Sequence, residues 1–250
     1  AREHDYGVLL LTQPDGAGAI RAAVAARQVD ALVLLNIIQD DPRIGPIVDT
    51  GFPAVLIGMP RDTQGIDAVD LDFAAGARVL VDHLADAGHR EATFLTWPDE
   101  VFQSGRTYAE RFRDAALAEA ARRRLVLDIV SCPAGPEQVR DALRTALARS
   151  TAPRALLVHN DAVVAMLPTV LHELGLSVPD DYSVVSLHSA ELGRIFALPY
   201  TSVESEPERV SKLAVDILVR RLTTPDGPAA VTTLVAPRLV ERASVAAAVS

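Results

Sequence analysis

The 250-residue sequence lacks several features that would assign it to a specialised class of protein. Its single cysteine, Cys132, excludes an internal disulfide and fits a reducing, cytoplasmic environment. No apolar run reaches membrane-spanning length, because Asp, Arg, Gly or Pro interrupts each of them. The first residues, AREHDYGVLLL, place charges around a very short apolar stretch, which is not the pattern of a signal peptide.

Positive charge is also scarce. The formal net charge is −9 and no Lys/Arg run stands out, which argues against nucleic-acid binding across the whole surface. Nucleophile elbows, paired-carboxylate arrangements and metal-binding spacings are missing too, so we expect no catalytic residues, no metal and no cofactor. What the sequence does have is 49% hydrophobic residues, which is enough for a well-packed globular core.

Apolar strand-like runs alternate with amphipathic helical patterns along almost the whole chain, which predicts α/β architecture with doubly wound parallel sheets. The strands are expected at 6–11, 31–36, 54–58, 68–71, 92–97, 126–131, 155–160, 182–188 and 201–203, with one or two more near the end of the chain. The helices are expected at 17–27, 43–49, 73–87, 105–122, 136–149, 161–174 and 207–222.

These strand–helix repeats are too many for one compact layer, so we predict two subdomains hinged around a ligand cleft. Trp97-Pro98-Asp99 is the best internal boundary, because a proline after an aromatic strand end breaks the rhythm. The N-terminal subdomain would comprise 1–97 and about 206–228, and the C-terminal subdomain 98–205 and about 229–250. The pattern of the first half starts one strand late, and we expect the natural protein to extend further toward its N-terminus.

Several short segments follow one another in a distinctive order and spacing. They are VDLD (69–72) with Gly76-Ala77, His83-Leu84 and GHR (88–90), then Asn160-Asp161, HELGLSVPDDYSVVS (172–186), PYTSV (199–203) and APRLVERAS (236–244). Together they resemble the effector-binding core of the LacI/GalR family of bacterial transcription regulators. The resemblance implies the type I periplasmic-binding-protein-like fold, a small-molecule effector and a homodimer. It also implies operator DNA as a partner, through an N-terminal helix-turn-helix domain that is absent from this sequence.

Three candidate ligand-binding residues follow predicted parallel strands at the edge where ligands bind in such sheets. Asn160 offers a donor and an acceptor to a ligand hydroxyl, although it could instead cap the helix that follows. His188 stands where the resemblance implies an aspartate that holds sugar hydroxyls, and His159 where it implies a small residue. If their strands are neighbours, we expect both imidazoles to face the mouth of the cleft; the alternative is two unrelated polar strand ends.

The remaining candidates lie near the predicted boundary. Tyr108 stands where the resemblance implies a sugar-binding arginine, and Arg106 could replace that arginine only if the helix starts at a shifted position. Ser104 is expected to cap this helix or to donate to the ligand. Phe73 follows Asp72 where the resemblance implies asparagine, and it is either a packing residue or an apolar wall for the ligand. Trp97 and Phe102 could also stack on a ligand, but core packing is the simpler interpretation.

These departures suggest that the effector is not a plain monosaccharide, or that a sugar-derived effector binds in a changed pose. Histidine donors and aromatic rings would suit an acidic, phosphorylated or aromatic molecule.

The apolar run 163–167 suggests a helix buried on two sides, the second against a partner subunit or against other segments of this chain. Pro168 should kink or restart that helix. The alternative functions are a transporter's solute-binding protein, which shares the fold, and, with less support, an enzyme.

Overall fold

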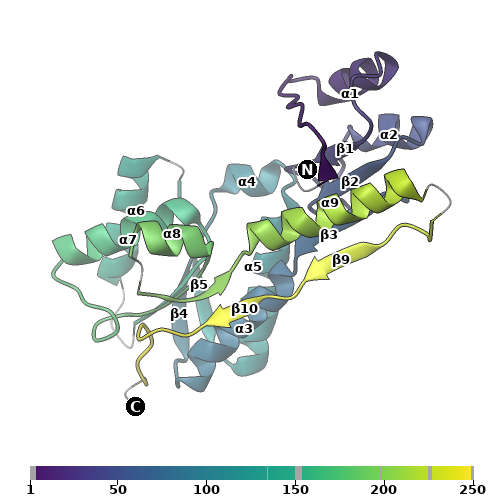
Figure 1. Cartoon of the computed structure of the whole chain (residues 1–250). Helices are drawn as coiled ribbons and strands as arrows, with labels where there is room; N and C mark the ends of the chain where they lie inside the picture. Colours follow the sequence, from purple (N-terminus) through teal and green to yellow (C-terminus); the bar gives the residue numbers. More distant parts are fainter. Residues whose placement is uncertain (1–3, 134, 150–153, 198, 225–226, 249–250) are drawn as a thin grey trace. The chain divides into compact units, whose positions relative to one another are not determined.

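The computed structural model describes residues 4–133, 135–149, 154–197, 199–224 and 227–248 (Figure 1). These residues form two compact units, each built on its own sheet. The first unit comprises residues up to 71, 105–107 and 207–235, and the second comprises 72–104, 108–206 and the segment from 236 onward. The predicted α/β class with two separate parallel-type sheets is confirmed.

The first unit has a four-stranded parallel sheet in the order β1-β2-β3-β9. Its elements are α1 (Gly16–Ala25), β1 (Leu32–Leu34), α2 (Ile44–Thr50), β2 (Ala54–Ile57), β3 (Asp67–Leu71), α9 (Pro207–Thr223) and β9 (Thr232–Val235). Hydrophobic side chains pack on both faces, as expected for buried parallel strands. One face lies under α1 and α2, and the other lies under α9.

Helix α9 returns from late in the sequence to cover β2 and β3, as predicted. Its apolar stripe, which includes Val210, Ala214 and Ile217, packs on Val55 and Val69. An ion pair fixes the end of this helix, because the Arg221 guanidinium binds the Asp67 carboxylate at 2.6 and 3.1 Å. Asp67 is only 3% exposed, so its charge is stabilised by this pairing.

The strand expected at 6–11 does not form. Residues 6–11 belong to no sheet in the part of the chain that the structure describes, and Val8, Leu9 and Leu10 are exposed. A parallel strand gains its backbone hydrogen bonds only from a neighbouring strand, and the outer edge of β1 pairs with no described strand. Apolar content alone therefore did not bring this segment into the sheet.

The second unit has a six-stranded sheet in the order β10-β8-β7-β6-β4-β5. All neighbouring strands are parallel except β10, which runs antiparallel to β8. The strands are β4 (Glu91–Thr96), β5 (Val126–Ser131), β6 (Ala155–Val158), β7 (Ser183–His188), β8 (Thr201–Glu204) and β10 (Arg238–Val240). The helices are α3 (Phe73–Asp86), α4 (Asp99–Gln103), α5 (Thr107–Arg123), α6 (Pro136–Arg149), α7 (Asp161–Glu173) and α8 (Ala190–Ile195).

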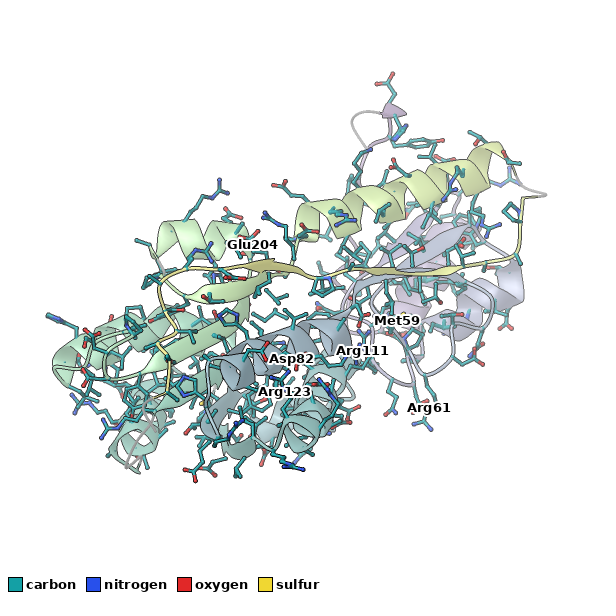
Figure 2. The ribbon with its side chains drawn as sticks, turned by 90° about the horizontal axis from the view of Figure 1, so that it is seen from below. Met59, Arg61, Asp82, Arg111, Arg123 and Glu204 are labelled. Carbon is teal, nitrogen blue, oxygen red and sulfur yellow. The ribbon has the colours of Figure 1, made fainter. Side chains whose placement is uncertain are left out.

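Alternating side chains of these strands serve two separate packing surfaces. Leu156, Val158 and Val184 pack in one core with residues of α6 and α7. On the other face Phe94 contacts Phe112 of α5. Helices α3 and α5 are also joined by charge, since Arg122 and Arg123 donate to the Asp82 carboxylate at 3.1 and 3.0 Å, and Figure 2 shows Asp82 beside Arg123.

Helix α7 corrects two expectations. It runs without interruption through Pro168, so it does not restart there, and the alternative of a kink stays a prediction. Its second apolar side packs against α6 of the same chain, with Val139 and Leu143 in the shared core. The apolar run 163–167 therefore gives no argument for a partner subunit, because the alternative explanation accounts for it.

The division between the units also differs from the predicted boundaries. Strand β4 pairs with β5 and β6, so the first unit ends at Leu71 and Trp97 lies inside the second unit. At the end of the chain, β9 pairs with β3 and extends the first unit to Val235. Strand pairing decides both points, and the proline at 98 marks only the turn between β4 and α4. No helix among the described residues is long and apolar enough to cross a bilayer.

Candidate ligand site at the strand ends of the second unit

Three neighbouring strands of the second unit end at the same edge of the sheet. Strand β4 ends at Thr96, followed by Trp97; β6 is followed by His159 and Asn160; and β7 ends at His188. The carboxyl ends of parallel strands are where α/β sheets bind ligands. Of the seven predicted site residues, Asn160, His159 and His188 lie at this edge.

Five side chains form an aromatic cluster here: Phe73, Trp97, Tyr108, Phe112 and His159. The rings of Phe73, Trp97, Tyr108 and His159 have centroid distances of 5.6–6.0 Å in five of their pairings. His159 and Phe112 are closest, at 4.0 Å. These are distances of direct ring contact, so the five side chains form one continuous group of packed rings.

Local structure explains why the rings meet. Phe73 is the first residue of α3, whose N-terminus is capped by Asp72 through a 2.9 Å bond from the Ala75 amide. Tyr108 and Phe112 lie one turn apart on α5, and residues four apart share a face of a helix. The prediction of Phe73, Tyr108 and His159 as site residues thus selected three members of one cluster. Phe112 was not predicted, although its spacing of four residues from Tyr108 places both on the same face of the helix.

His159 is buried, with 2% of its surface exposed. Burial lowers the pKa of its imidazole to about 3, because a charged ring would lose its hydration without gaining a counter-ion. His159 is therefore neutral at physiological pH. Its Nδ1 atom is buried and makes no hydrogen bond to any described residue.

Two further polar atoms beside His159 share this condition. Thr96 Oγ1 and Trp97 Nε1 are buried and find no hydrogen-bond partner among the described residues. We call these two atoms and His159 Nδ1 the unpartnered trio. More than nine in ten buried polar groups in native proteins are hydrogen-bonded, so three exceptions at adjacent strand ends are unusual. Thr96 could not be singled out from the sequence, because a threonine that ends a strand is ordinary.

Asn160, in contrast, is fully engaged. Its Oδ1 accepts hydrogen bonds from the Ala162 and Val163 amides at 3.0 and 3.4 Å, which caps α7. Its Nδ2 donates to the carbonyl oxygens of Thr96 and Cys132 at 3.4 and 3.5 Å. The side chain is 1% exposed. The structure thus gives Asn160 the capping role that the sequence left as the alternative, and Asn160 also joins the ends of β4 and β5 to α7.

His188 lies in a different environment. Its Nδ1 is 2.9 Å from Ser186 Oγ, and its Nε2 is buried without a partner among the described residues. Gly193 of α8 lies against the ring, since a Cβ atom there would be 3.0 Å from Nε2. Burial, reinforced by the positive charge of Arg242, lowers the pKa of His188 to about 4, and Glu204 partly offsets this.

The expectation that the two imidazoles face one mouth is therefore wrong, although β6 and β7 are neighbours as supposed. The register pairs Val158 with Ser186, so the next positions bring His159 beside Leu187 and Asn160 beside His188. Successive side chains point to opposite faces of a strand. His159 consequently joins α3 and α5, whereas His188 points toward α8.

The last two predicted residues are not members of the aromatic cluster. Ser104 ends α4, is exposed and donates to the Val101 carbonyl at 2.7 Å, so it does not cap the next helix. Arg106 is exposed and belongs to the first unit, with Gly105 and Thr107. Among the residues that the structure describes, no three His, Cys, Asp or Glu side chains are placed to hold a metal ion.

Comparisons with known proteins agree with this architecture. The sequence profile of the periplasmic binding protein-like domain matches residues 81–245. The HTH-type transcriptional repressor PurR of Edwardsiella ictaluri is 29% identical over 91% of this chain and 67% of its own length. The HTH-type transcriptional repressor MelR of Bacillus subtilis is 25% identical over 78% of this chain and 58% of its own length.

Solved structures share the fold. A LacI family transcriptional regulator from Bifidobacterium animalis subsp. lactis matches with a TM-score of 0.84 and 23% identity, over 99% of this chain and 90% of its own. A LacI family regulator from Enterococcus faecium with bound ribose matches with a TM-score of 0.81 and 16% identity, over 98% of this chain and 90% of its own.

The fold defines a two-unit α/β core of the periplasmic-binding-protein type. The chain belongs to the periplasmic binding protein-like domain family, and the two sequence relatives named above are HTH-type transcriptional repressors. The solved structures that share its fold include LacI family regulators, in agreement with the sequence resemblance. The chain spans 58% to 67% of the length of the two repressors named above.

Proposed function

We propose that this chain is the effector-binding core of a LacI-type transcription regulator. In this proposal a small molecule binds at the strand ends of the second unit and changes the affinity of the whole protein for operator DNA. The observation that supports the site is the unpartnered trio beside the aromatic cluster, at the edge where parallel sheets bind ligands. The repressor relatives favour this function over that of a transporter's solute-binding protein.

The partners follow from the same proposal. Operator DNA would be bound by a helix-turn-helix domain on the N-terminal side, and the intact protein would act in the cytoplasm as a homodimer. The homodimer is proposed from the family resemblance alone. The apolar second side of α7 does not support it, because α6 of the same chain covers that side. Catalysis has no support from the relatives, which are regulators. The effector would be a sugar derivative, or a molecule that differs from a plain sugar, with an acidic, phosphorylated or aromatic group.

A ligand screen tests the proposal. The Tm of the 250-residue chain is measured in the presence of each compound of a small-molecule library. Compounds that raise the Tm are then measured again with the Phe73→Ala and Phe102→Ala variants. These phenylalanines are matched, since each is half-buried with an arginine guanidinium 5.5 or 4.6 Å from its ring centroid, but only Phe73 belongs to the aromatic cluster. We expect the stabilising shift to be lost in Phe73→Ala and kept in Phe102→Ala.

DNA binding is then measured on the full-length gene product by fluorescence anisotropy, with DNA from upstream of its own gene. Allosteric coupling should change the DNA affinity by roughly 5- to 150-fold when the hit is added. Failure to bind DNA both with and without the hit would contradict a regulatory function. Light scattering of the same sample tests the homodimer.

A further inference from the structure

We propose that the effector is an uncharged planar heteroaromatic molecule, whose ring lies on the aromatic cluster and whose polar edge bonds to the unpartnered trio. This rests on the proposed function for the location of the site, and it goes further by selecting one chemical class. A heteroaromatic ring has two apolar faces and an edge of hydrogen-bonding atoms. The ends of β4 and β6 offer aromatic rings to the apolar faces and unpartnered polar atoms to the edge.

The trio is a local group, not a scatter of unrelated atoms. Strands β4 and β6 are neighbours, and their register pairs Leu95 with Val158, so Thr96 and His159 are the next pair and point to the same face. Trp97 follows Thr96 directly, and its ring meets His159 edge-on at 5.9 Å and 87°. All three polar atoms therefore lie around one aromatic surface.

Asn160, one residue further along, shows that this edge can satisfy its polar groups within the chain. A buried polar group without a partner costs about as much as a lost hydrogen bond. Three such groups beside one another are better explained by a partner from outside the chain. The hydroxyl of Thr96 both donates and accepts, whereas the indole N–H of Trp97 only donates. The ligand must therefore present at least one acceptor.

The rings favour a flat molecule. Phe73 and Tyr108 are half-buried, and their centroids are 5.6 Å apart with an interplanar angle of 41°. Ring-to-ring contact leaves no space for a ligand between these rings, and the trio is buried beside them, so the ligand enters as the half-buried rings move apart to admit it. A hexose carries hydroxyls around its whole ring and needs many polar partners, but the trio supplies only three polar atoms.

Charge argues against an acidic group. His159 is neutral because burial lowers its pKa to about 3, so it cannot pair with a carboxylate at physiological pH. The Arg111 guanidinium is stacked over Phe73, with its central carbon 5.5 Å from the ring centroid. A carboxylate bonded to the trio would lose hydration without gaining a counter-ion there, because the trio atoms are uncharged and the Arg111 guanidinium is already stacked on Phe73.

Isothermal titration calorimetry on the 250-residue chain separates the classes. The probes are adenine, uracil and nicotinamide as neutral heteroaromatics, with glucose, ribose, benzoate and inorganic phosphate as the alternatives. We expect at least one heteroaromatic to bind and the alternatives to bind far more weakly. Thr96→Val should weaken that binding about 2- to 10-fold, the worth of one hydrogen bond. Phe73→Ala should weaken it about 5- to 100-fold through lost stacking, and Phe102→Ala less than twofold.

The outcomes separate this inference from the proposed function. If a sugar or an anion binds instead, with sensitivity to Phe73, the chemical class is wrong and the proposed effector site stands. If a heteroaromatic binds but Thr96→Val and Phe73→Ala leave its affinity unchanged, the assigned contacts are wrong. If no heteroaromatic probe binds, the inference is overturned. If, in addition, the library screen yields no ligand that depends on Phe73, the proposed effector site fails as well.

Discussion

Replacing Thr96 with valine should stabilise the free chain. The Thr96 side chain is 2% exposed, and its hydroxyl has no hydrogen-bond partner among the described residues. A buried hydroxyl without a partner costs about 1–3 kcal/mol, and valine has nearly the same shape without that penalty. We therefore expect the free energy of unfolding to rise by about 1 kcal/mol or more, which corresponds to about 2–4 °C in Tm for each kcal/mol.

Thr201→Val is the matched control in the same sheet. Thr201 is fully buried at the start of β8, where its hydroxyl donates to the Arg242 carbonyl and accepts from the Arg242 amide, both at 2.9 Å. Removing this hydroxyl leaves both backbone groups without that partner, so the variant should lose about 1–3 kcal/mol. The same chemical change thus has opposite expected signs at the two sites.

Differential scanning calorimetry and urea unfolding measure whether each variant gains or loses stability relative to the unsubstituted chain. Loss of stability in Thr96→Val by 1 kcal/mol or more would mean that its hydroxyl has a partner in the free protein, such as an ordered water. The unpartnered trio would then give no argument for a ligand. A stabilised Thr96→Val variant that also binds the effector more weakly would show that Thr96 serves binding at a cost to stability.

Three further variants test other parts of the structure. Arg221→Met should cost the first unit about 3–5 kcal/mol in urea unfolding, because it leaves the buried Asp67 carboxylate without its ion pair, whereas Lys212→Met, in an exposed pair, should change stability by at most about 1 kcal/mol. Near-equal losses would refute this account. Asn160→Ala should cost about 1–2 kcal/mol as a lost helix cap, and an unchanged Tm would show that the cap is not needed. His188 has a folded pKa of about 4, below the usual 6.5 of the unfolded chain, so its stabilising contribution is present above pH 6.5 and falls by about 1 kcal/mol between pH 7 and 5.5. His188→Gln should flatten that decline, and an unchanged pH profile would show that His188 is not its source.

Much of the fold was predictable because it depends on local patterns. Helix α9 illustrates this, since the spacing of Val210, Ala214 and Ile217 predicts one apolar face, and that face is buried. Strand 6–11 marks the limit, because its apolar residues could not indicate whether a neighbouring strand was available. The division between the units failed for the same reason, as the sequence does not state which strands β4 and β9 pair with.

The candidate site shows the same division between local and tertiary information. The sequence by itself determined that His159, Asn160 and His188 follow buried strands, because apolar runs and helix starts are properties of adjacent residues. It could not determine what each side chain meets. Strand register placed His159 with Phe73 and Tyr108 and turned His188 toward α8, and the Thr96 hydroxyl has no partner among the described residues. Pairing register and helix packing join residues far apart in the chain, so only the tertiary structure decided which polar groups were satisfied and which were not.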